Sequence, residues 1–247
     1  MSILQDQLFH FLIVIGFMLI YFFSKYLELA KLNTRKMMSF AAGVGISYVI
    51  IHMLPLLEYS QKQLDKYFDW QSGIHSTHLV YGMVLIGLIM TYVVYKIDQD
   101  SYEETAKENP VEAKAIVFWS DIYFFAVYNA MIGYLVMAKA FSGNIHMITY
   151  FIAFGLHFLM NDCGLRHHHN EKYDSIGRKV LAISILFGGV VSLFLSLPYY
   201  VVVAFEAFIT GGLLLNGIKF ELPNDNNGDL KSFVLGAVGS GILFLFV

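Results

Sequence analysis

Two apolar stretches of this sequence carry polar side chains of the types that bind cations or carry protons. In one stretch His157 and Asn161 are four residues apart, and in the other Asp121 and Tyr128 are seven apart. Because a helix repeats about every 3.6 residues, each pair falls on one face of a helix. Imidazole nitrogens and amide or carboxylate oxygens bind zinc and similar cations, so we predict a polar path between the two helices. Its residues are Asp121, Tyr128, Asn129, His157, Asn161 and Asp162.

Three consecutive histidines, His167, His168 and His169, follow the second of these stretches. Successive residues of a helix point about 100° apart, so three in a row cannot all face one way. We therefore expect these histidines to lie in a loop. Two interpretations remain open, a solvated loop and a transient metal acceptor at the cytoplasmic mouth of the path.

Two further ionisable side chains occur in other apolar stretches. Glu206 lies in the stretch 199–218, where an ionised carboxylate is costly unless it is paired or hydrated. It is a candidate for a functional or proton-linked acid. His52 precedes Pro55 at the end of another stretch. It is either a feature of that helix end or a ligand where a cation would enter from outside.

The composition is that of a membrane protein. Of the 247 residues 57% are hydrophobic and 14% are charged, whereas about 25% are charged in an ordinary soluble domain. This apolar excess cannot be buried in one soluble core. The sequence has no basic patch interleaved with aromatic residues, so we expect no nucleic-acid partner. The lipid bilayer is the first expected partner.

A helix that crosses a bilayer needs about 20 mostly apolar residues, and eight stretches approach this length. We therefore predict an all-α polytopic protein in which residues 1–247 form one transmembrane domain. The predicted spans are Leu8–Phe23, Met38–Leu57, Leu79–Tyr95, Ala115–Met137, His146–Cys163, Val180–Leu197, Tyr199–Ile218 and Leu230–Val247. Pro198 separates the sixth span from the seventh, since proline disfavours helix at the preceding residue. Asn109, Pro110 and Glu112 form a helix start before the fourth span.

The distribution of Lys and Arg predicts the orientation of these spans. Thirteen of the sixteen basic residues fall in one set of alternate loops, and three fall in the other set. Basic residues concentrate on the cytoplasmic side, so both termini are expected outside. The compact loops favour a multi-pass protein of a bacterial cytoplasmic membrane.

Two segments far apart in the sequence resemble each other. Phe40–Pro55, "FAAGVGISYVIIHMLP", aligns without a gap on Phe208–Pro223, "FITGGLLLNGIKFELP", with five identities in sixteen positions. The predicted spans that hold them run in opposite directions, which is typical of the inverted repeats of secondary transporters. The first three and last three helices would then be the two halves, with the fourth and fifth between them. The alternative is a chance likeness between glycine-containing helices that end in proline.

At this point the sequence resembles the Zrt/Irt-like (ZIP) divalent-metal transporters. The "HMLP" of His52–Pro55 is similar to the His-Leu-Leu-Pro ending of the family's second helix, and "FITGGLLLNGIKFELP" to its glycine-rich seventh helix. The resemblance implies eight helices in a 3+2+3 arrangement with both termini outside. It also implies a metal site between the fourth and fifth helices.

The motifs of that site are degenerate here. Asn129 keeps the asparagine of the fourth-helix motif, and His157 keeps the histidine of the fifth. Ile132, Phe158 and Asn161 stand where the family has acidic residues. Without these carboxylates a dication is poorly compensated in a low-dielectric site, so we expect no binuclear site there, and a weaker mononuclear site stays open. His167, His168 and His169 remain further candidate ligands.

Two functions remain open. The first is a ZIP-like transporter of a divalent cation such as Zn²⁺, in which the cation is the substrate and no cofactor is tightly bound. The second is a transport-deficient ZIP-fold protein that acts as a sensor, a partner subunit or the carrier of another solute. An intramembrane zinc hydrolase would need ligands at one depth, and the histidines are spread in depth, so we expect no enzyme. A homodimer is compatible with either function.

Overall fold

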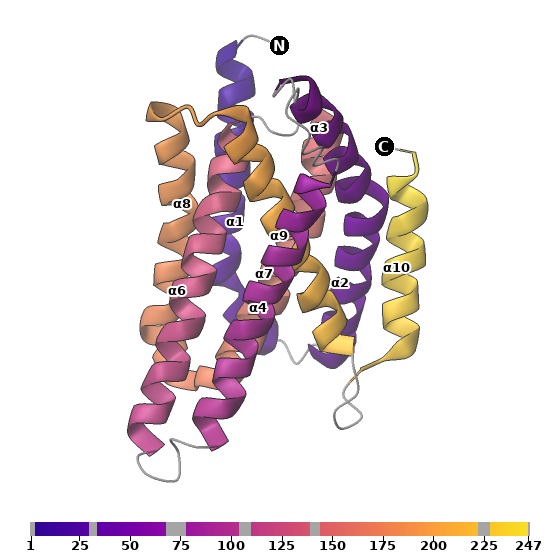
Figure 1. Ribbon diagram of the computed structural model, residues 1–247. Coiled ribbons are helices and arrows are strands. Elements are labelled where there is room, and N and C mark those ends of the chain that lie inside the picture. Colours follow the sequence, from indigo (N-terminus) through magenta and orange to yellow (C-terminus); the bar gives the residue numbers. More distant parts are fainter. Residues whose placement is uncertain are drawn as a thin grey trace. The chain divides into compact units, whose positions relative to one another are not determined.

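The structure is a computed structural model, which describes residues 3–29, 34–67, 78–103, 110–138, 144–221 and 228–246 (Figure 1). All regular secondary structure in these residues is helical, which confirms the predicted all-α class. The helices are α1 (Ile3–Leu29), α2 (Thr34–Tyr48), the π-helical turn η1 (Val49–Met53), α3 (Leu54–Tyr67), α4 (Leu79–Glu103), α6 (Pro110–Met137), α7 (Asn144–Lys172), the π-helical turn η2 (Tyr173–Gly177), α8 (Arg178–Phe194), α9 (Tyr199–Glu221) and α10 (Leu230–Phe244). Six helical stretches of the described residues are long and apolar enough to cross a bilayer, and α10 is a shorter apolar helix. The chain is therefore compatible with a multi-pass membrane protein.

Two of the proline rules applied to the sequence hold in the structure. Pro110 is the first residue of α6, and Glu112 lies in its first turn, while Asn109 is outside the described residues. Helix α8 ends at Phe194, and the carbonyl of Pro198 accepts the first backbone hydrogen bonds of α9. Proline thus begins one helix and separates two others, as its missing N–H and fixed φ dictate.

The prediction that a helix ends at Pro55 is wrong. Helices α2 and α3 are continuous from Thr34 to Tyr67 through the π-helical turn η1, which directly precedes Leu54 and Pro55. A proline ring clashes with the carbonyl four residues before it, and a wider turn at that place relieves the clash. The matching Pro223 lies outside the described residues.

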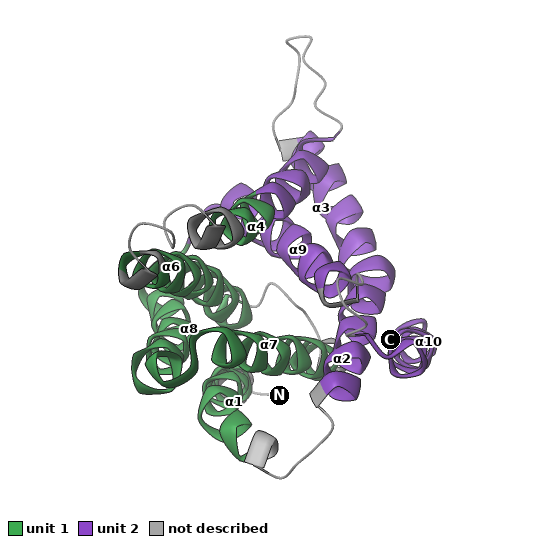
Figure 2. Cartoon of the chain, turned by 90° about the horizontal axis from the view of Figure 1, so that it is seen from below, with its two compact units in different colours: residues 1–34, 90–196 green, residues 35–89, 197–247 purple. Residues whose placement is uncertain are grey.

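The chain forms two compact units, coloured green and purple in Figure 2. Unit 1 comprises residues 1–34 and 90–196, and therefore holds α1, the second part of α4, α6, α7, η2 and α8. Unit 2 comprises residues 35–89 and 197–247, and holds α2, η1, α3, the first part of α4, α9 and α10. Each unit is built from segments that are distant in the sequence.

In unit 1, α7 runs antiparallel to α6. Asp121 in the first half of α6 contacts His169 near the end of α7, whereas Tyr128, further along α6, contacts His157. The two helices therefore face each other along the stretch that carries the predicted polar path.

Helix α8 runs parallel to α6, and the two lie side by side in Figure 1. The amide of Asn129 donates to the carbonyl of Leu181, and the hydroxyl of Tyr134 donates to the carbonyl of Leu195. Since α7 is antiparallel to α6 and α8 is parallel to it, the chain reverses between α7 and α8. The long apolar stretch 147–194 thus consists of two helices.

In unit 2, the helices that contain the two similar segments are antiparallel. Gly217 of α9 faces Ala42 and Ile46 of α2, whereas Leu57 of α3 packs with Val203 and Ala207 at the start of α9. Residue numbers rise along one helix as they fall along the other. The segment Phe40–Pro55 therefore runs opposite to the helix that carries its counterpart.

Matching residues of the two segments make matching contacts inside unit 2. A methyl group at Gly43 of α2 would collide with the backbone of α10, and one at Gly236 of α10 would collide with the backbone of Phe40. Likewise, a methyl group at Gly211 of α9 would collide with the backbone of α4, and one at Gly87 of α4 with that of Phe208. Phe40 aligns with Phe208 and Gly43 with Gly211, so the crossing of α2 and α10 repeats, residue for residue, in the crossing of α9 and α4.

Candidate functional site

The interior of unit 1 holds a buried imidazole beside a buried phenol. His157 of α7 and Tyr128 of α6 are each 1% exposed, and their ring centroids are 5.8 Å apart. The Nε2 atom of His157 lies 3.1 Å from the amide nitrogen of Asn161, while its Nδ1 atom has no hydrogen-bond partner. His157 and Asn161 lie about one turn apart on α7, so their side chains meet, as their spacing of four residues predicts.

Asn129 holds three helices of unit 1 together. Its amide nitrogen donates to the hydroxyl of Tyr21 on α1 at 2.9 Å and, more weakly, to the carbonyl of Leu181 on α8 at 3.4 Å. The side chain is fully buried, and its Oδ1 atom has no hydrogen-bond partner. A ligand-type oxygen and a ligand-type nitrogen, from Asn129 and His157, are therefore both buried and unpaired in the same unit.

Apolar side chains fill two of the positions where the ZIP motifs have acids. Ile132 and Phe158 are both fully buried. The ring of Phe158 packs edge-on against Phe17 of α1 with centroids 4.9 Å apart. These side chains belong to the packed core of unit 1, so a cation at His157 would meet neutral groups there.

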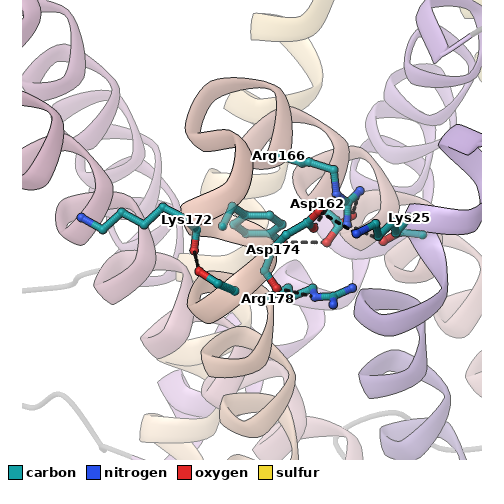
Figure 3. Close-up of polar contacts among 9 residues, drawn as sticks. Lys25, Asp162, Arg166, Lys172, Asp174 and Arg178 are labelled. Atoms are coloured by element: carbon teal, nitrogen blue, oxygen red, sulfur yellow. Dashed lines mark hydrogen bonds and ion pairs between the residues drawn. The ribbon is translucent and has the colours of Figure 1, made fainter.

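Asp162 lies in an ion network at the end of α7 (Figure 3). Its Oδ2 atom is 2.6 Å from Nη1 of Arg166, and its Oδ1 atom accepts a hydrogen bond of 2.7 Å from the hydroxyl of Tyr173. The carboxylate is fully buried and the Arg166 side chain is 8% exposed. Asp162, predicted to line the path, thus has its charge balanced by a neighbouring guanidinium.

The same guanidinium extends the network to two other elements. Arg166 Nε donates to Asp174 of η2 at 2.9 Å, and its Nη2 atom donates to the hydroxyl of Ser24 on α1 at 3.1 Å. Lys25 lies 3.3 Å from the second oxygen of Asp174. One buried arginine therefore ties the ends of α1 and α7 to the turn before α8.

A second group of ligand-type side chains joins α6 to the end of α7. His169 Nε2 is 2.8 Å from Oδ2 of Asp121, and His168 Nδ1 is 3.9 Å from the same oxygen. One ligand atom from each of the three residues lies within 4.8 Å of the others. His167, which is exposed, does not belong to this group.

The prediction that the three histidines lie in a loop is wrong, because all three are in the last turns of α7. Asp121 of the facing helix gives His168 and His169 a common partner, a tertiary contact that helical periodicity alone does not reveal. The regular helix is interrupted directly after them at Asn170, whose backbone has φ 49° and ψ −126°. Asn170 is the non-glycine residue with positive φ among the described residues.

Glu206 and His52, the two remaining predicted pathway residues, belong to unit 2. Glu206 is buried in α9, within electrostatic range of the buried Tyr48 of α2. His52 is half-buried in η1, where its ring stacks on that of Tyr48 with centroids 5.0 Å apart. The described contacts therefore place these two residues near one tyrosine and give neither a set of cation ligands.

The residues that the sequence analysis missed are the partners of Asp162 in the ion network. Arg166 was counted with the basic loop residues, yet it is a buried residue of α7. Its spacing of four from Asp162 is the signal that would have revealed the pair, since such residues are neighbours on a helix. Tyr173 and Asp174 carry no comparable signal, because they reach the pair only through the turn between α7 and α8.

Comparison with known proteins gives no match, since no family model, curated protein or solved structure matches this chain. The likeness to ZIP transporters consequently depends on the motifs of the sequence.

Proposed function

We propose that this chain is a ZIP-like membrane transporter of a divalent cation such as zinc, with eight spans and both ends of the given sequence outside. The observation that carries the proposal is the repeated crossing in unit 2, where Phe40 and Gly43 relate to α10 as Phe208 and Gly211 relate to α4. Equivalent packing by antiparallel segments is the architecture of inverted-repeat transporters. The reversal between α7 and α8 supports counting them as two spans.

The proposed substrate site is centred on His157 in unit 1. Its unpaired Nδ1 atom and the unpaired Oδ1 atom of Asn129 are buried polar atoms, which in folded proteins normally have a partner or hold a water molecule or ion. If the amide of Asn161 turned over, its oxygen would accept from Nε2–H and leave the Nδ1 lone pair for a cation. Asn161 then orients His157, as outer hydrogen-bond partners orient metal-binding histidines.

The charge balance of this site favours weak and reversible binding. A dication beside His157 and Asn129 receives no carboxylate, because Ile132 and Phe158 are apolar. Asp162 is already paired with Arg166. Neutral ligands compensate the charge of a desolvated dication poorly, so the cation would be bound weakly. A transport site needs release as much as binding, which suits such a ligand set.

The same observations favour one alternative, a transport-deficient ZIP-fold protein that acts as a sensor or a partner subunit. Full burial of Ile132 and Phe158 closes the positions where acidic ligands would stand. Asp162, the buried carboxylate of α7, is already paired with Arg166. In this alternative the architecture is kept for a conformational change, and the cation is no longer carried.

Uptake by the purified chain in proteoliposomes distinguishes the two functions. We expect uptake of at least one of Zn²⁺, Fe²⁺, Mn²⁺ and Co²⁺ above that of empty vesicles, and a loss of at least ten-fold in His157→Ala. His78→Ala is the matched control, because His78 is an exposed histidine of unit 2 at the start of α4, and it should transport normally. Failure of the unmodified chain to take up any of the four metals would remove the transporter and leave the alternative.

A further inference from the structure

We propose that Asp121, His168 and His169 form a binding site for a zinc-class divalent ion. The bound ion would link the end of α7 to α6. The site is separate from His157 and does not depend on whether the chain transports a metal. Among the described residues, these three are the group of ligand-type side chains whose donor atoms converge.

The distances suit a small tetrahedral ion. Ligand atoms at about 2.0–2.1 Å from zinc are about 3.3 Å from one another in a tetrahedron. The contacts of Asp121 Oδ2 with His169 and His168 are 2.8 and 3.9 Å, which lie on either side of that value. Small side-chain rotations would therefore bring all three donor atoms to one ion.

The ligand set selects the class of metal. Two imidazoles and one carboxylate are a common set of three protein ligands for zinc, with the fourth position left to water. Magnesium and calcium prefer oxygen ligands, whereas imidazole suits zinc, cobalt and nickel. The single carboxylate also supplies a negative charge, which the neutral groups around His157 do not.

The three ligands differ in burial in a way that gives the site a rigid side and an open side. The side chains of Asp121 and His169 are each 6% exposed, whereas that of His168 is 51% exposed. The ring of Phe118 packs edge-on against His169 with centroids 5.2 Å apart and limits its rotation. An ion can reach the site from the His168 side, which leaves room for a water ligand.

The backbone beside the site is strained. Asn170, which directly follows His169, has φ 49° and ψ −126°, a conformation that costs a non-glycine residue free energy. Strain of this kind persists where surrounding contacts hold it. The contact of His169 with Asp121 is such a restraint, and an ion shared with His168 would strengthen it.

The test is a cobalt titration of the full chain in detergent, followed by the visible d–d absorption of tetrahedral Co²⁺ and by competition with Zn²⁺. We expect one site with this spectrum, and at least ten-fold weaker binding in His168→Ala and in Asp121→Asn. His167→Ala is the matched control, because His167 is an exposed neighbour outside the group. This variant should bind Co²⁺ as tightly as the unmodified chain. Since His168 is half exposed, its removal leaves the core of unit 1 intact.

Three results would overturn the proposal. They are the absence of a tetrahedral cobalt spectrum, equal weakening by His167→Ala and His168→Ala, and unchanged binding in His168→Ala. The same titration of His157→Ala separates this site from the transport site. Binding that persists in His157→Ala while uptake is lost supports two distinct sites, whereas loss of the cobalt spectrum in that variant would contradict them.

Discussion

Asp162 and Arg166, one turn apart on α7, form an ion pair of 2.6 Å in which neither side chain is more than 8% exposed. Removing two charges from water is costly, and the pair compensates this cost only while both members are present. The pair also gives unit 1 a fixed positive charge next to its buried carboxylate. Its integrity is therefore a matter of both stability and charge balance.

Arg166→Leu should destabilise unit 1 by about 3–5 kcal/mol, because Asp162 is left as an uncompensated buried charge. Thermal unfolding in detergent would show this as a lowered Tm. The double variant Asp162→Leu with Arg166→Leu should regain most of the loss, since no lone charge remains. Lys179→Leu, an exposed change at the start of α8, serves as control. Equal Tm values for Arg166→Leu and Lys179→Leu would contradict a buried pair.

Gly43→Ala and Gly211→Ala should each cost about 1–3 kcal/mol of stability, because the added methyl group meets the backbone of the neighbouring helix. The equivalent crossings predict losses of similar size at the two positions. Gly239→Ala in α10 is the control, since nothing lies within 4 Å of its added methyl group. Thermal unfolding compares the three, and a neutral effect at Gly43 with a large one at Gly211 would refute the equivalence.

The start of α10 should lose stability in acid. Ser232 hydrogen bonds to the carboxylate of Asp229 with its side chain and also with its backbone N–H, and these two hydrogen bonds, the side-chain one first, hold the pKa of Asp229 below its ordinary value of 3.8. Because the folded state lowers this pKa, the stabilisation is complete above pH 3.8 and disappears as the pH falls through the lowered value. Hydrogen-exchange protection of the first turn, corrected for intrinsic rates, measures it. Asp229→Asn should abolish this pH dependence, and an unchanged dependence in that variant would assign it to another group.

The orientation of the chain in the membrane can be determined by cysteine labelling. Cys163 is the single cysteine and is buried, so Cys163→Ser provides a background without other thiols. In that background Lys62→Cys should react with a membrane-impermeant maleimide added outside intact cells, and Lys179→Cys should react only after the cells are opened. Both positions are exposed in the described structure. The reverse pattern would invert the proposed topology.

The fold class and several helix limits could be predicted from the sequence because they depend on local chemistry. Hydropathy and length indicate the apolar helices, and the missing N–H of proline fixes the start of α6 at Pro110 and the break at Pro198. Helical spacing likewise placed His157 near Asn161. None of these inferences requires knowledge of which helices meet.

The features that could not be predicted depend on tertiary contacts. The π-helical turn η1 lets the helix pass Pro55, although the local rule ends it there. His168 and His169 lie in the last turns of α7, where Asp121 faces them from α6. Arg166 is buried because Asp162 and Asp174 balance its charge, and only the folded turn brings Asp174 near. Counting basic residues in the predicted loops therefore places this arginine wrongly at the surface.

The most direct test of a cation site at His157 is a zinc-edge anomalous difference map from crystals of the chain grown with Zn²⁺. We expect a peak at about 2.1 Å from Nδ1 of His157, with the oxygen of Asn129 turned toward it. Loss of that peak in His157→Ala, with any peak at His168 and His169 retained, would complete the assignment. A map of the unmodified chain that shows zinc elsewhere and none at His157 would contradict it.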